Sequence, residues 1–192
     1  IANAYGVTAL KDAGVGFAAS GESFAALDRA GKLTLNVAVC LSTPYGGRTG
    51  PLDYAALEAE RDRNRTPRVH TDFVKLFVDG VPTPARTAAM LAPYVADKVH
   101  GNSFNGGLHL SPERLAEDVT ELDRRGFTVK MHVAGDRSVR VALDAIEAAR
   151  KANGNSGRHH ELAHAGYVSD QDLARFAQLD AIPDYAPILW YP

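Results

Sequence analysis

The fold is most readily inferred from the stretch Thr128-Val-Lys-Met-His132-Val-Ala-Gly-Asp136. Its apolar residues alternate with Lys130 and His132, and this period of two predicts a β-strand with the imidazole on the face opposite the apolar side chains. Asp136 is expected to cap a helix that begins at Arg137. His132 is therefore expected near the C-terminal end of a strand, where parallel α/β sheets and barrels bind ligands and metals.

Strand-like and helix-like patterns alternate along the rest of the chain, which predicts parallel strands joined by helices. Six β-prone runs are present: Val7 to Asp12, Leu33 to Leu41, Phe73 to Asp79, Thr128 to Ala134, His159 to Ala165 and Ala181 to Tyr185. Besides the helix after Asp136, helical patterns are expected at Glu22 to Arg29, Asp53 to Arg63, Ala85 to Tyr94, Ser111 to Arg125 and after Ser169. The clearest is the fourth, with Ser111 as N-cap, Pro112 at the first helical position and Gly126 as terminator.

An α/β barrel has eight strand-helix units in about 250 residues, whereas this chain shows about six. An open arc of six strands has two bare edges, which soluble proteins avoid. The chain is therefore expected to be incomplete, partnered, or a doubly wound sheet instead. Two loops rich in glycine or proline, Ser42 to Pro51 and Gly101 to Gly107, are candidates for substrate contact.

Composition excludes some classes of function. The 192 residues are 45% hydrophobic and 23% charged, with a net charge of −2 and no basic run, so no nucleic-acid partner is expected. No apolar run approaches the ~20 residues of a membrane helix, and we expect no membrane partner. The single cysteine, Cys40, is expected to pack in an apolar run, which favours a reducing, cytoplasmic location. The first residue is Ile1, so a targeting segment could precede it.

Lys75 lies in the middle of the apolar strand Phe73 to Asp79. Burial there would lower the pKa of the lysine and make its neutral amine available for covalent chemistry or metal ligation. The alternative is a lysine that reaches solvent at a sheet edge.

The segment His160-Glu161-Leu-Ala-His164 spells HExxH, the zinc-peptidase signature in which two histidines one helical turn apart bind zinc and the glutamate activates water. Gly157 and Gly166 bound the run closely, whereas a zinc-peptidase helix should be long and amphipathic. The peptidase is kept as an alternative.

Three motifs in order, Val74-Lys75-Leu-Phe77-Val-Asp79-Gly80, Met131-His132-Val-Ala-Gly-Asp136-Arg137 and His160-Glu-Leu-Ala-His164-Ala165, resemble the amidohydrolase superfamily. The most similar branch is amidohydrolase family 3, the YtcJ-like metal-dependent hydrolases. The likeness covers nearly all 192 residues.

This resemblance implies an α/β fold of the (β/α)8 TIM-barrel type, present here as strands two to seven in one partial barrel domain over residues 1–192. It implies one or two divalent metals, usually zinc, with Lys75, often carboxylated in the family, His132 and His164 as ligands. His160, Asp136 and Asp79 are expected to support the metal ligands without binding the metal themselves. An H-x-H strand and the strand-eight aspartate that acts as general base are expected outside this chain.

The function expected from the resemblance is hydrolysis of an amide or related non-peptide C–N bond in a small molecule by a metal-activated water. This chain would be an incomplete, inactive portion, completed by missing strands or a homo-oligomer partner. A non-catalytic, barrel-like binding module is the second alternative.

Overall fold

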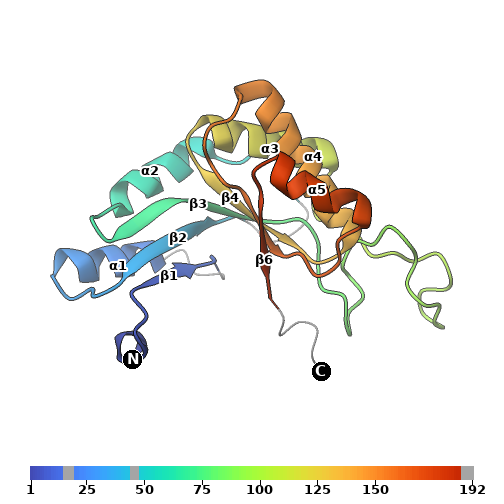
Figure 1. The fold of residues 1–192 in the computed structure, drawn as a ribbon, viewed down its shortest axis with the longest axis horizontal. Coiled ribbons are helices and arrows are strands. Elements are labelled where there is room, and N and C mark those ends of the chain that lie inside the picture. The colour runs from blue at the N-terminus through green and yellow to red at the C-terminus, as the bar shows by residue number, and fades with distance from the viewer. Residues whose placement is uncertain (15–19, 44–47, 187–192) are drawn as a thin grey trace. The chain divides into compact units, whose positions relative to one another are not determined.

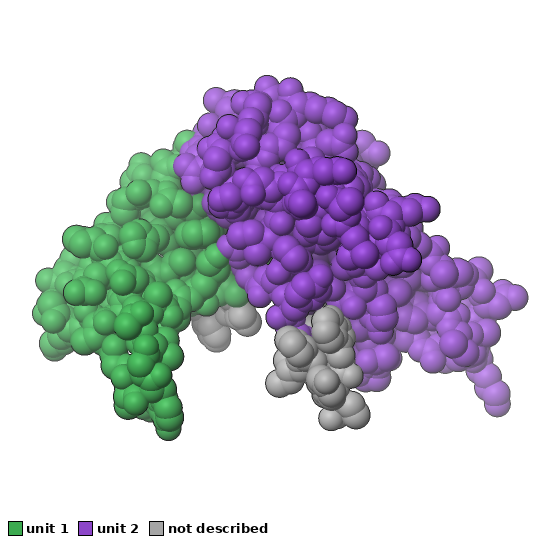
Figure 2. All heavy atoms as spheres, in the orientation of Figure 1, with its two compact units in different colours: residues 1–43, 52–75 green, residues 44–51, 76–192 purple. Residues whose placement is uncertain are grey.

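The structure is a computed structural model that describes residues 1–14, 20–43 and 48–186. It divides into two compact units, the first formed by residues 1–43 and 52–75 and the second by residues 44–51 and 76–192 (Figure 2).

The first unit is a layer of parallel strands with two α-helices (Figure 1). Its elements are the 3-10 helix η1 Ala2–Tyr5, β1 Ala9–Asp12, α1 Ser20–Arg29, β2 Asn36–Ser42, α2 Tyr54–Asn64 and β3 Val69–Phe77, whose last two residues belong to the second unit. Both helices pack against β2. The core cluster is Val37, Val39 and Val69. The predicted packing role of Cys40 is confirmed, because this residue is buried in β2.

The second unit continues the strand-helix alternation. Its remaining elements are α3 Pro112–Arg124, β4 Thr128–Val133, α4 Asp136–Asn153, β5 Glu161–His164, α5 Asp170–Gln178 and β6 Ile182–Tyr185. β5 pairs in parallel with both β4 and β6. α3 and α4 pack against each other and against β4 (Figure 1). The apolar set of β4, Val129, Met131 and Val133, is fully buried, as its alternation predicts.

The ends of α3 confirm the capping pattern in the sequence. The Ser111 hydroxyl accepts a hydrogen bond from the Arg114 N–H at 3.1 Å, and Pro112 is the first helical residue. Gly126 follows the helix with a φ of 82°, a left-handed conformation that glycine adopts without the steric cost of a Cβ. Ser169 caps α5 in the same way, accepting from the Gln171 N–H.

The predicted helix from Ala85 to Tyr94 is wrong, because these residues form an irregular segment with a turn and a few bends. Their backbone groups bond outside the segment: the Ala88 N–H donates to the Val81 carbonyl, the Met90 N–H to the Asn105 carbonyl and the Tyr94 N–H to the Phe104 carbonyl. A helix would need these same N–H groups to donate to carbonyls four residues earlier, so the observed hydrogen bonds take the place of helical ones.

Capping by Asp136 is also wrong. Gly135 is the N-cap residue, with no side-chain cap, and Asp136 is the first residue of α4. Its carboxylate instead accepts the Leu91 N–H at 2.7 Å.

The six strands are hydrogen-bonded neighbours in chain order, β1-β2-β3-β4-β5-β6. A doubly wound sheet reverses its strand order at a switch point, so that alternative is wrong. Parallel strands in chain order, joined by helices, are the order of a (β/α) barrel. The predicted class is confirmed as an incomplete (β/α) barrel. Within the described residues, the helices are all too short or too polar to span a membrane.

Candidate metal centre

Asp79 anchors the site in the second unit. This carboxylate is fully buried two residues beyond β3, and it accepts three backbone hydrogen bonds of 2.9 Å, from Ala134, Gly135 and Ala89. A buried carboxylate is costly unless donors compensate its charge. The three N–H groups compensate the charge of Asp79, and the same hydrogen bonds hold the turn after β4 against the segment that follows β3.

His132 is next to this carboxylate, and its side chain is 12% exposed. Its Nε2 lies 2.7 Å from the Gly80 carbonyl oxygen and 3.9 Å from Asp79 Oδ1. Because a carbonyl only accepts, Nε2 carries the hydrogen, and in the neutral ring Nδ1 then carries the lone pair. Metal-binding histidines are oriented in this way, with the second ring nitrogen donating to a carbonyl or carboxylate.

His164 is the last residue of β5, the strand beside β4. Its ring centroid lies 4.6 Å from that of His132, with the rings edge to face at 68°. The structure therefore brings together His132 and His164, two of the three predicted metal ligands, at the C-terminal ends of adjacent parallel strands.

The backbone is strained where β5 ends. His164 has a φ of 77° and Ala165 a φ of 39°, so two consecutive residues with a Cβ adopt left-handed conformations. Such conformations cost about 1–2 kcal/mol per residue, and they are concentrated at active sites and ligand clamps. The strain lies at the residue that points an imidazole toward His132.

Lys75 belongs to the first unit and is 4% exposed. It lies in β3, which has a neighbour on each side, so the alternative of a lysine reaching solvent at a sheet edge is wrong. The Thr43 hydroxyl donates to the Lys75 carbonyl at 2.7 Å. Desolvation of this side chain, which the sequence predicts, is confirmed by its burial.

Lys130, two residues before His132 on the same face of β4, forms a charged cluster. Its Nζ lies 3.0 Å from Glu161 and also contacts Asp184 of β6. Burial acts to lower the pKa of Lys130, but the hydrogen bonds from its ammonium to Asp184 and Glu161 outweigh this effect and raise the pKa above its usual value. Lys130 is therefore a cation that holds Glu161 in an ion pair.

His160 does not join the two other histidines. It is fully buried just before β5, where its Nδ1 accepts the Val129 N–H at 3.0 Å and its Nε2 lies 3.1 Å from Asp123. Because residues 161–164 form a strand, His160 and His164 are about 13 Å apart along the chain. The HExxH zinc-peptidase alternative requires a helix and is therefore wrong.

Sequence reasoning missed the role of Ala89. Its N–H donates to Asp79, and its carbonyl accepts the N–H groups of Arg137 and Ser138 at the start of α4. A Cβ at Gly135 would lie 2.0 Å from this carbonyl oxygen, so the position requires glycine. In the sequence, only the glycine at position 135 indicates that the Ala89 carbonyl comes this close to the start of α4.

Within residues 1–14, 20–43 and 48–186, no group of three or more His, Cys, Asp and Glu side chains could hold a metal ion. The two clustered imidazoles are suitable donors for zinc, but a complete set needs further ligands. The predicted ligand set also includes Lys75, and lysine is not one of these four residue types.

Three comparisons relate the chain to known proteins. A family model described as "Amidohydrolase family" matches residues 2–191. The chain is 27% identical to the exoenzymes regulatory protein AepA of Pectobacterium carotovorum subsp. carotovorum over 177 residues, which is 91% of this chain and 35% of AepA. It is 31% identical to the putative amidohydrolase YtcJ of Bacillus subtilis (strain 168) over 121 residues, 63% of this chain and 21% of YtcJ.

A solved structure, described as an uncharacterized metal-dependent hydrolase from Pyrococcus horikoshii OT3, matches 97% of this chain and 34% of that chain, with 25% identity and a TM-score of 0.73. The chain thus spans about a third or less of the length of these relatives.

Proposed function

The chain belongs to the amidohydrolase family, and we propose that it is the part of a metal-dependent hydrolase that holds a divalent metal. The bond cleaved is an amide or related non-peptide C–N bond in a small molecule. The observation that carries the proposal is the pair of imidazoles, His132 and His164, whose rings lie 4.6 Å apart at two adjacent strand ends. The description of the Pyrococcus horikoshii relative as a metal-dependent hydrolase supports it.

The proposed metal ligands are Lys75, His132 and His164. The hydrogen bond from His132 Nε2 to the Gly80 carbonyl orients the ring in the way that is typical of metal-binding histidines. Zinc fits imidazole nitrogen, and when bound it lowers the pKa of water from about 16 toward about 7 and polarises a carbonyl.

Lys75 is proposed to act as a carbamate. A lysine amine that burial keeps neutral can add carbon dioxide, losing a proton and becoming an anionic oxygen ligand. The 4% exposure of Lys75 supports this proposal, since desolvation disfavours the ammonium form.

Asp79 and Asp136 are proposed to position the site without touching the metal. Asp79 accepts three N–H groups around the turn after β4, and Asp136 holds Leu91 against the start of α4. His160 is proposed to stabilise the opposite end of β5 through Asp123. The general base is assigned to the strand-eight aspartate that the resemblance implies, outside these 192 residues.

The test is hydrolysis of a panel of small amides by the full-length protein, with and without a chelator. We expect chelation, His132→Ala and His164→Ala each to reduce the rate at least about a hundredfold, because each removes a metal ligand or the metal. His159→Ala is the matched control, because this histidine is half exposed at the other end of β5 and pairs with Asp180. Activity that survives chelation and both ligand variants would overturn the proposal.

A further inference from the structure

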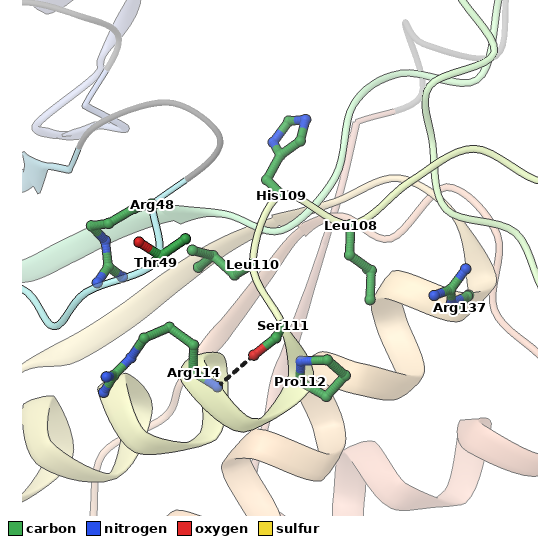
Figure 3. Close-up of a pocket in the computed structure, with 9 residues that line it drawn as sticks. All are labelled: Arg48, Thr49, Leu108, His109, Leu110, Ser111, Pro112, Arg114 and Arg137. Atoms are coloured by element: carbon green, nitrogen blue, oxygen red, sulfur yellow. Dashed lines mark hydrogen bonds between the residues drawn. The ribbon is translucent and has the colours of Figure 1, made fainter.

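A cavity of about 470 Å³ lies in the second unit at the start of α3 (Figure 3). Arg48, Arg114 and Arg137 line it together with Thr49 and residues 108–112. This volume is in the range of small-molecule sites, which are about 300–1,000 Å³. Residues 44–47 of the loop expected to contact substrate lie outside the described residues, but Arg48 and Thr49 of that loop reach this cavity.

The three arginines come from three separate segments. Arg48 precedes α2, Arg114 lies in the first turn of α3 and Arg137 lies in the first turn of α4. Figure 3 shows Arg48 and Arg114 at one end of the lining and Arg137 at the other. The cavity therefore has guanidinium groups on two sides.

Two of these arginines are fixed by one buried carboxylate. Asp118, which is fully buried, forms ion pairs with Arg48 and, at 3.4 Å, with Arg114. Arg114 also pairs with the exposed Glu117 at 2.6 Å. Side chains already held in place lose little conformational entropy when a ligand binds.

The cavity has more cationic groups than carboxylates to balance them. Three guanidinium groups face two carboxylates, Asp118 and Glu117, and Arg137 forms no ion pair within the part of the chain that the structure describes. The Arg114 Nε is buried and makes no hydrogen bond to any described residue. A buried donor of this kind is normally satisfied by an acceptor. The start of α3, with its positive end of the helix dipole, adds to the preference for an anion.

We propose that this cavity, the arginine pocket, binds a small molecule through an oxyanion, a carboxylate or a phosphate. Planar guanidinium groups match the geometry of both anions and donate two hydrogen bonds at once. The proposal is independent of the metal centre, since the arginine pocket contains none of the proposed metal ligands.

The test is calorimetric titration of the purified full chain with inorganic phosphate and, separately, with succinate, at low ionic strength. We expect saturable binding of at least one anion, and a dissociation constant about tenfold higher in Arg137→Gln, because the variant removes a charge-assisted donor. Arg137 is the variant of choice because it forms no ion pair within the described residues, whereas Arg114 forms an ion pair with the buried Asp118. Phosphate binding alone identifies a phosphate ligand, and succinate binding alone a carboxylate ligand.

Two control variants complete the design. Arg124→Gln removes the same charge from α3 at an exposed position paired with Glu121, outside the cavity, and should leave the affinity unchanged. His132→Ala should also bind the anion normally, which excludes an anion held by a metal. The proposal is overturned if neither anion saturates below about 10 mM, if Arg137→Gln binds as the wild type does, or if His132→Ala abolishes binding.

Discussion

Asp79 is the residue on which the geometry of the candidate metal centre depends. Its two carboxylate oxygens accept N–H groups from the turn after β4 and from Ala89. A carboxylate can accept all three donors, whereas an asparagine at the same place has one carbonyl oxygen and presents an NH₂ group to the remaining donors.

We therefore expect Asp79→Asn to destabilise the protein by about 2–4 kcal/mol, since it leaves buried N–H groups without an acceptor. The measurement is the free energy of unfolding from urea denaturation. Asp144→Asn is the control, because this aspartate is 57% exposed and pairs with Arg175 at the surface. A loss of stability no larger than that of the control would contradict the role of Asp79.

Ala165 follows the last residue of β5 with a φ of 39°, a conformation that glycine adopts more easily than alanine. We expect Ala165→Gly to stabilise the protein by up to about 1 kcal/mol, because it removes left-handed strain at a position without a large side chain. The measurement is the midpoint of urea unfolding. Ala163→Gly, two residues earlier within the strand, should instead lower the stability of the protein. Destabilisation by both substitutions would show that the end of β5 stores no strain.

For individual residues, the sequence predicts which side chains share a face of a strand, but not the backbone groups to which those side chains form hydrogen bonds. Alternation along the strand places Lys130 and His132 together, and the burial of Lys75 follows from its apolar neighbours. The three donors to Asp79 belong to residues 10 to 56 positions away along the chain. No local pattern encodes that distance, and for the same reason the bond from Asp136 to Leu91 was not predicted.

At the scale of elements, the contact between the end of α3 and the start of β5 depends on a buried pair, Asp123 and His160. Burial acts to raise the pKa of Asp123, but hydrogen bonds from His160, Ser156 and Asn153 together lower it below its usual range. Arg150 adds an ion pair at 3.2 Å. The carboxylate is therefore more acidic in the folded protein than in the unfolded chain.

A depressed pKa in the folded state contributes stability above the unfolded pKa, which is about 3.9 for aspartate, and this contribution is lost as the pH falls. We expect the wild type to lose at least about 1 kcal/mol more than Asp123→Asn between pH 6 and about pH 3. The measurement is urea unfolding at both values of pH. Parallel acid dependence of the two proteins would show that Asp123 is not specifically stabilised by its partners.

Elements with strong local signals were predicted well, and those fixed by tertiary contacts were not. The helix from Pro112 to Arg124 has its cap, its initial proline and its terminal glycine in the sequence, and the structure confirms it. The second strand begins at Asn36, three residues later than expected. The alanine-rich segment from Ala85 to Tyr94 has helix-forming residues but no helix, since its backbone donors bond to Asp79 and to backbone carbonyls on both sides of the segment.

At the scale of the whole molecule, the strand order and the family agree with what the sequence predicts. Six β-prone runs in alternation with helices indicate the parallel, sequential order that the structure shows. We propose that His132 and His164, which the second unit brings together, hold a divalent metal, with Lys75 as the third proposed ligand.

Elemental analysis of the purified protein for zinc, repeated on His132→Ala and on the control His159→Ala, tests this claim most directly. We expect about one zinc ion per chain in the wild type and in His159→Ala, and loss of most of it in His132→Ala, because the ligand set then lacks an imidazole. Wild-type protein without zinc or another divalent metal, or a His132→Ala variant that keeps its metal, would contradict the claim.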